Sequence, residues 1–72
     1  MTYYLLIGDE YIEAGTLSFN KFYPDQTTFQ ILIKMIDDEN NLDKKLIVDE
    51  KNQSYTVAEF LDYITKNYKI VT

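Results

Sequence analysis

The chain has 72 residues, with twelve aspartates and glutamates against seven lysines, and it contains no cysteine, histidine or arginine. This composition excludes a disulfide framework and a Cys/His zinc site, and it leaves a single hydrophobic core to stabilise one compact domain over residues 1–72. The net charge of −5 repels nucleic-acid phosphates and anionic membrane surfaces, and it favours a protein partner with a basic surface.

Membrane insertion and export are not expected from the sequence. No apolar run approaches the roughly 20 residues that a membrane-spanning helix needs. The N-terminal residues lack the basic region and the small-residue cleavage site of a secretory signal peptide. We therefore expect a cytoplasmic protein that contacts neither a membrane nor nucleic acid directly.

The first predicted element is a strand over residues 2–7. This segment is rich in aromatic and β-branched side chains, which favour extended structure. Tyr3 and Tyr4 should then point to opposite faces, so one of the two should be exposed. Gly8 indicates a turn directly after the strand.

The next part of the chain predicts a hairpin with a break in it. Residues 11–13 continue the hairpin, Gly15 interrupts it, and residues 16–20 alternate between polar and apolar as a half-buried strand does. Residues 22–25 are predicted to form a loop, because the residue before Pro24 is restricted to extended geometry.

Residues 27–36 fit both a helix and a strand. Phe29, Leu32 and Ile36 have the spacing of one face of a helix. One face of a strand would instead carry every second residue: Phe29, Ile31, Ile33 and Met35. The adjacent threonines and the three isoleucines favour a strand. We therefore predict a strand here, with a helix as the alternative.

The clearest predicted element is a helix over residues 57–67. Thr56 and Glu59 fit the S/T-x-x-E capping box, and Tyr55 and Phe60 fit the hydrophobic staple that accompanies it. The apolar positions of this helix form one stripe: Val57, Phe60, Leu61, Ile64 and Tyr68.

The predicted fold is α+β, a small antiparallel sheet of four to five strands with one C-terminal helix packed on one face. Residues 44–49 and 69–71 supply the later strands, and the acidic segment 37–43 is predicted to be a loop. If residues 27–36 are helical, the alternative is two helices on a three-stranded sheet. In both cases an apolar helix stripe is buried against an apolar sheet face.

The residue types that usually carry catalysis are missing from this chain. There is no histidine to act as general base, no cysteine nucleophile and no arginine clamp. Ser18 and Ser54 lack a G-x-S-x-G context, and Gly8 lacks a phosphate-binding glycine pattern. We therefore expect a protein that is not an enzyme and that uses no cofactor.

The acidic segment 37–43 has the composition of a calcium-binding loop. With Asp37 at the first position, the third and fifth positions also carry oxygen donors. The glycine that such a loop requires is replaced by Leu42, and the bidentate glutamate is replaced by Val48. We therefore expect a solvated loop and no metal site.

Protein binding is the class of function that these exclusions leave. Clustered carboxylates suit a basic partner, and tyrosines are enriched in protein interfaces. The residues expected to contact the partner are the loop carboxylates and two aromatic anchors: Asp37, Asp38, Glu39 and Asp43, with Tyr11 and Tyr23.

In size and charge the chain resembles the small acidic inhibitors of restriction and CRISPR systems that phages encode. The likeness concerns bulk properties and no motif. It implies, as a hypothesis, a phage- or mobile-element-encoded inhibitor that acts in the host cytoplasm by occupying the basic surface of a nucleic-acid enzyme. The alternative is a structural or assembly subunit that acts through self-association, for example as a homodimer paired at strand edges.

Overall fold

The computed structural model describes residues 1–37 and 43–71 of the chain. Within these residues two helices are formed, α1 (Gln26–Ile36) and α2 (Val57–Asn67). The strands are β1 (Thr2–Ile7), β2 (Glu10–Ser18), β3 (Lys21–Pro24), β4 (Ile47–Asp49), β5 (Ser54–Tyr55) and β6 (Lys69–Ile70).

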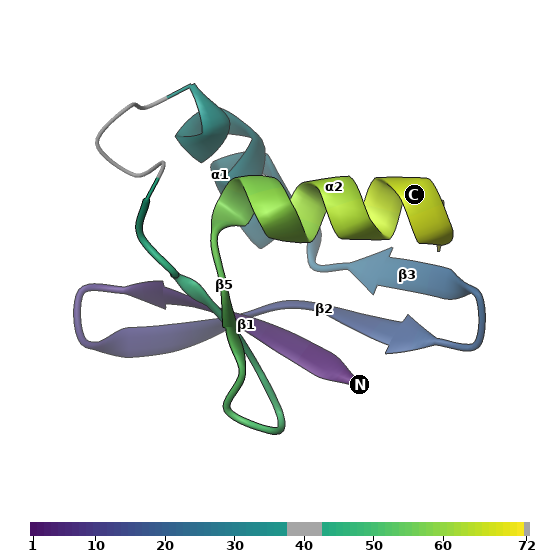
Figure 1. The fold of residues 1–72 in the computed structure, drawn as a ribbon, viewed down its shortest axis with the longest axis horizontal. Helices are drawn as coiled ribbons and strands as arrows, with labels where there is room; N and C mark the ends of the chain where they lie inside the picture. Colours follow the sequence, from purple (N-terminus) through teal and green to yellow (C-terminus); the bar gives the residue numbers. More distant parts are fainter. Residues whose placement is uncertain (38–42, 72) are drawn as a thin grey trace.

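The strands form one mixed sheet with the order β5-β4-β1-β2-β3-β6. Neighbouring strands are antiparallel except β3 and β6, which run parallel. Both helices lie on the same side of the sheet, and no described helix covers the other side (Figure 1). The α+β class is confirmed and the alternative with two helices fits, but the predicted sheet was too small and its all-antiparallel arrangement was wrong.

The segment 27–36 is helical, so the predicted strand was wrong. The Asp25 side chain caps the helix by accepting a hydrogen bond from the backbone N–H of Thr28 at 3.0 Å. Leu32 is fully buried, and Phe29 packs against the core from the same helix face. The cap and the helical apolar stripe therefore outweigh the strand preference of the β-branched residues, which is weak and depends on context.

The predicted C-terminal helix is confirmed as α2, together with its cap. The Thr56 hydroxyl accepts from the backbone N–H of Glu59 at 3.1 Å, and the Glu59 carboxylate accepts from the backbone N–H of Thr56 at 3.1 Å. On the outer side, Lys66 and Asp62 form an ion pair at 3.1 Å. The final strand, predicted at residues 69–71, is present as β6.

The first two hairpins depart from the prediction in two places. Residues 22–25 do not form a loop, because most of them belong to β3. The expected break at Gly15 is a bulge inside a continuous β2, where the register shifts between Tyr3 and Tyr4 of the opposite strand. Gly15 is suited to this site because a Cβ atom there would overlap the ring of Phe22.

The core lies between the sheet and the two helices and is dominated by aromatic rings. The Tyr3 and Phe60 ring centroids are 4.8 Å apart, and those of Phe22 and Phe60 are 5.7 Å apart. Leu5, Phe22 and Phe60 have at most 1% of their surface exposed. This packing joins β1, β3 and α2 and leaves the opposite side of the sheet to other side chains.

Candidate functional site

The side of the sheet opposite α1 and α2 carries its own set of partly exposed apolar residues. Tyr3 and Leu5 of β1 point into the core, so Tyr4 and Leu6 point to the opposite side. The two adjacent tyrosines therefore point to opposite faces as predicted, but Tyr4 is partly buried instead of exposed. We call this side the open face, made up of Thr2, Tyr4, Leu6, Tyr11, Glu13, Thr16, Tyr23, Val48 and Glu50.

Cross-strand register places the open-face residues in rows. Tyr4 pairs with Val48 of β4 on one side and with Glu13 of β2 on the other. Leu6 pairs with Tyr11, which is 60% exposed. Side chains opposite one another in such pairs are in contact range, so these rows form one continuous surface.

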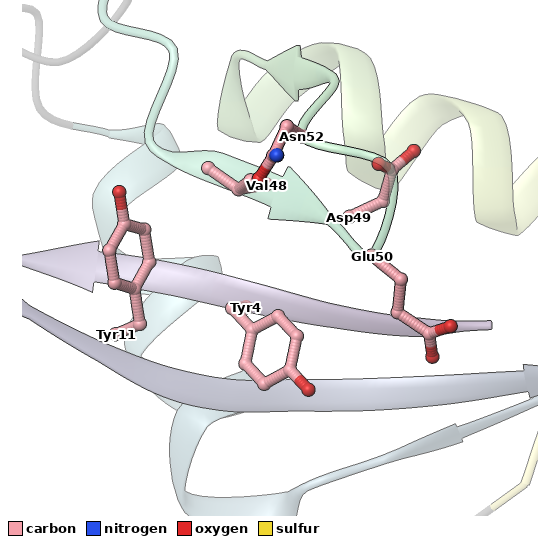
Figure 2. A pocket seen from close by; sticks show the side chains of 6 residues that line it. All are labelled: Tyr4, Tyr11, Val48, Asp49, Glu50 and Asn52. Carbon is pink, nitrogen blue, oxygen red and sulfur yellow. The ribbon is translucent and has the colours of Figure 1, made fainter.

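A shallow hollow of about 470 Å³ lies on this face. The Tyr4 and Tyr11 rings lie on the same side of the β1 and β2 ribbons and form part of its wall (Figure 2). The remaining wall comes from β4 and the turn after it: Val48, Asp49, Glu50 and Asn52. The hollow therefore combines aromatic surface with two carboxylates.

Asp49 is buried, with 4% of its surface exposed, and it organises the turn beside the hollow. Its carboxylate accepts from the backbone N–H groups of Lys51 at 2.8 Å and Gln53 at 3.0 Å, and from the Tyr55 hydroxyl at 2.8 Å. Burial opposes ionisation, but these hydrogen bonds outweigh it and lower the pKa of Asp49 below its ordinary value. Asp49 therefore stays charged and serves to hold the turn.

Tyr55 is the complementary partner of this carboxylate. Burial, followed by the hydrogen bond to Asp49, raises the pKa of Tyr55 to about 12. Both shifts move the pKa values of this pair away from neutrality, so we assign Asp49 and Tyr55 a structural role in holding the turn.

Glu50 lies at the rim of the hollow and has a defined position. Its Oε1 accepts from the backbone N–H of Thr2 at 2.7 Å. This hydrogen bond lowers the pKa of Glu50. The rim therefore presents a fixed negative charge next to the tyrosines.

Negative charge continues along the β1–β2 hairpin. The first lysine of the chain is Lys21, and the acids that precede it are Asp9, Glu10 and Glu13. Lys21 pairs with Ser18 at the far end of β2, so this lysine lies away from the hollow. The part of the open face near the hairpin is thus aromatic and acidic.

The predicted contact residues fall in different places. Tyr11 and Tyr23 are exposed and both lie on the open face. Asp37 ends α1, on the side covered by helices, and Asp43 is exposed before β4; neither lines the hollow. Asp38 and Glu39 lie outside the described residues.

Five residues of the hollow were not among the predicted contacts: Tyr4, Val48, Asp49, Glu50 and Asn52. Tyr4 meets the residues of β4 and its turn only through the pairing of β1 with β4. The alternation within residues 2–7 was a signal for Tyr4, since it predicts one exposed tyrosine. No local signal marks Val48 and Glu50, because a strand of three residues is too short to show alternation.

In residues 1–37 and 43–71, no three histidine, cysteine, aspartate or glutamate side chains are grouped so as to hold a metal ion. In the same part of the chain, no helix is long and apolar enough to cross a membrane. Comparisons with protein-family models, curated proteins and solved structures gave no significant match.

Proposed function

We propose that this chain is a non-enzymatic protein-binding module whose open face binds the basic surface of a partner protein. The observation that carries the proposal is the sheet face that α1 and α2 leave uncovered, where Tyr4, Tyr11 and Tyr23 lie on the same side as Val48 and an acidic rim. A surface of this kind has both an aromatic centre and charges that select the partner.

The tyrosines supply the contact area. Tyrosine is enriched in interfaces because it presents a large rigid ring with a polar end and loses little conformational entropy on binding. Tyr4 is half-buried by its neighbours and Tyr11 is 60% exposed, so the first ring is already held in place while the second remains accessible. Such pairs of a fixed and an accessible ring are suitable anchors for a partner.

The carboxylates supply the selectivity. Glu50 at the rim and Glu13 beside Tyr4 favour lysine and arginine side chains and disfavour acidic surfaces. Charges at the rim of an interface chiefly raise the association rate, and this effect weakens with salt. Binding through this face should therefore be sensitive to ionic strength.

The narrower proposal is that the partner is an enzyme that holds nucleic acid on this basic surface. Strongly basic patches are typical of nucleic-acid-binding sites, and the net charge of −5 suits such a patch. The chain would then act as an inhibitor, encoded by a phage or another mobile element. Duplex DNA should compete with the chain for the partner, and simultaneous binding of both would contradict this form of the proposal.

Affinity capture with matched tyrosine variants tests the open face. Wild-type, Tyr11→Ser and Tyr63→Ser proteins are used as bait in a nuclease-treated bacterial lysate. Tyr63 is the control because it is 45% exposed and lies on α2, away from the open face. We expect a basic protein that the wild type and Tyr63→Ser retain, that high salt releases, and that Tyr11→Ser loses; equal retention by all three baits would overturn the proposal.

A further inference from the structure

The strand β2 has a free edge over its first half. β3 pairs with β2 only from Gly15 to Ser18, and Pro24, opposite Gly15, is the last residue of β3. The chain then turns into α1, and the backbone N–H of Asp25 donates to the Ala14 carbonyl at 3.0 Å. Figure 1 shows β3 beside only the second half of β2.

The hydrogen-bonding direction of this edge follows from β1. The backbone N–H of Leu6 donates to the Leu46 carbonyl at 2.8 Å, so the backbone polar groups of Leu6 and Tyr4 point toward β4. The residues opposite them are Tyr11 and Glu13. In an antiparallel ladder, residue pairs that exchange hydrogen bonds alternate with pairs that do not. Leu6–Tyr11 and Tyr4–Glu13 are pairs of the second kind, so the N–H and C=O groups of Tyr11 and Glu13 point away from β1.

No described group forms a hydrogen bond with these four backbone groups. The edge is also longer than the ends of the sheet, because the outermost strands β5 and β6 have two residues each. An edge with unpaired backbone groups is a template for an added strand. Because Tyr11 lies both on this edge and on the open face, a strand added at the edge would extend the open face.

The charges beside the edge indicate which strand it accepts. The acidic residues on or next to this edge are Asp9, Glu10 and Glu13, and no lysine precedes residue 21. A second copy of β2 would bring two identical acidic sets together, and like charges on adjacent strands are destabilising. A strand with lysine or arginine side chains would instead form opposite-charge pairs.

We propose that the edge of β2 at Tyr11 and Glu13 pairs with an extended, basic segment of the partner protein. This inference rests on the proposed function, since it assumes that the open face is the binding surface. The added strand forms backbone hydrogen bonds with Tyr11 and Glu13, and its basic side chains on the open face lie next to Glu13. This mode of binding supplies affinity through the backbone and selectivity through alternate side chains.

Amide hydrogen exchange measured by NMR on the full chain tests the inference. The probe is a blocked peptide of alternating lysine and valine, with the corresponding glutamate–valine peptide as control. In the free protein the Tyr11 and Glu13 amides should exchange rapidly, whereas the Ile12 amide, which points toward β1, should be protected. The lysine–valine peptide should slow the Tyr11 and Glu13 amides by about tenfold or more, and the control peptide should not.

The possible results distinguish strand pairing at the edge of β2 from binding at the open face alone. Unchanged exchange at Tyr11 and Glu13, combined with chemical-shift changes at Tyr4 and Val48, would overturn the edge pairing while supporting the proposed function. Absence of both effects would also overturn the edge pairing. The Glu13→Gln variant should still show protection at residue 13 with weaker binding, because it keeps the backbone N–H and removes one charge.

Discussion

Gly8 and Phe19 occupy equivalent positions in the two hairpin turns. Each is the first residue of a two-residue turn, and their φ angles are 61° and 56°. Glycine adopts such angles without steric cost, whereas a residue with a Cβ atom is strained there. The Phe19 ring is 97% exposed, so no core contact offsets the strain.

The Phe19→Gly variant should be more stable than the wild type. Removing the strain outweighs the entropy cost of glycine, and we expect the free energy of unfolding to rise by about 0.5–1 kcal/mol. Urea denaturation measures this difference. Phe19→Ala is the control because it keeps the strained backbone; a glycine variant no more stable than the alanine variant would contradict the explanation.

Asp49 supports the turn beside the hollow, and its replacement should be costly. Asp49→Asn loses charge-assisted hydrogen bonds to Lys51, Gln53 and Tyr55, so the free energy of unfolding at neutral pH should fall by about 1–3 kcal/mol.

This stabilisation should also depend on pH. Because the folded pKa of Asp49 lies below the unfolded value of about 3.9, the contribution is complete above that value and is lost as the pH falls through the folded pKa. The difference between Asp49→Asn and wild type should therefore shrink in acid, as measured by urea unfolding from neutral to acidic pH. A difference independent of pH would show that the carboxylate charge is not responsible.

Among the secondary-structure elements, the sequence predicts one of the two helices more clearly than the other. For α2, the capping box, the staple positions and the apolar stripe all agree, and its bounds were predicted correctly. For α1, the Asp25 cap competes with a run of β-branched residues, and local preference favours the wrong element. The burial of Leu32 between sheet and helix decides the outcome, and this contact is not visible in a short window of sequence.

The α2 cap provides the test at this scale. Thr56→Ala removes the acceptor for the Glu59 N–H and should lower the free energy of unfolding by about 1 kcal/mol. Glu59→Gln should cost less, because glutamine can still accept from the Thr56 N–H. Thermal or urea unfolding measures both, and an equal loss in the two variants would argue against a reciprocal cap.

The sheet shows where prediction from the sequence ends. The parallel pairing of β3 with β6 joins residues that are far apart in the chain, and β5 is too short for a periodic signal. The same limit applies to the candidate site, since Tyr4 meets Val48 only after β4 has paired with β1. Exposure of Tyr11 and Tyr23 was predictable from the sequence, but their shared face was not.

At the scale of the whole molecule, the two sides of the sheet have different roles. One side is covered by both helices and contains the aromatic core (Figure 1). The other side carries half-exposed tyrosines next to carboxylates. This division lets a small chain bury a core on one side of its sheet and leave a broad side-chain surface exposed on the other.

Two surfaces of the molecule are candidates for the partner-binding site. The sequence predicts contacts at the acidic segment with Asp37 and Asp43 and also at Tyr11 and Tyr23, and in the structure both tyrosines lie on the open face. We propose that the open face binds the partner, so the two surfaces must be compared by changing each of them separately.

The most direct measurement is the affinity of the captured partner, purified, for two double variants of this chain. Tyr11→Ser/Glu13→Gln alters the open face, and Asp37→Asn/Asp43→Asn removes two charges from the acidic segment. We expect the first to weaken binding at least about tenfold, or about 1.4 kcal/mol, and the second to change it about twofold or less. A large loss in the second variant with binding retained in the first would contradict the open-face account and place the contact at the acidic segment.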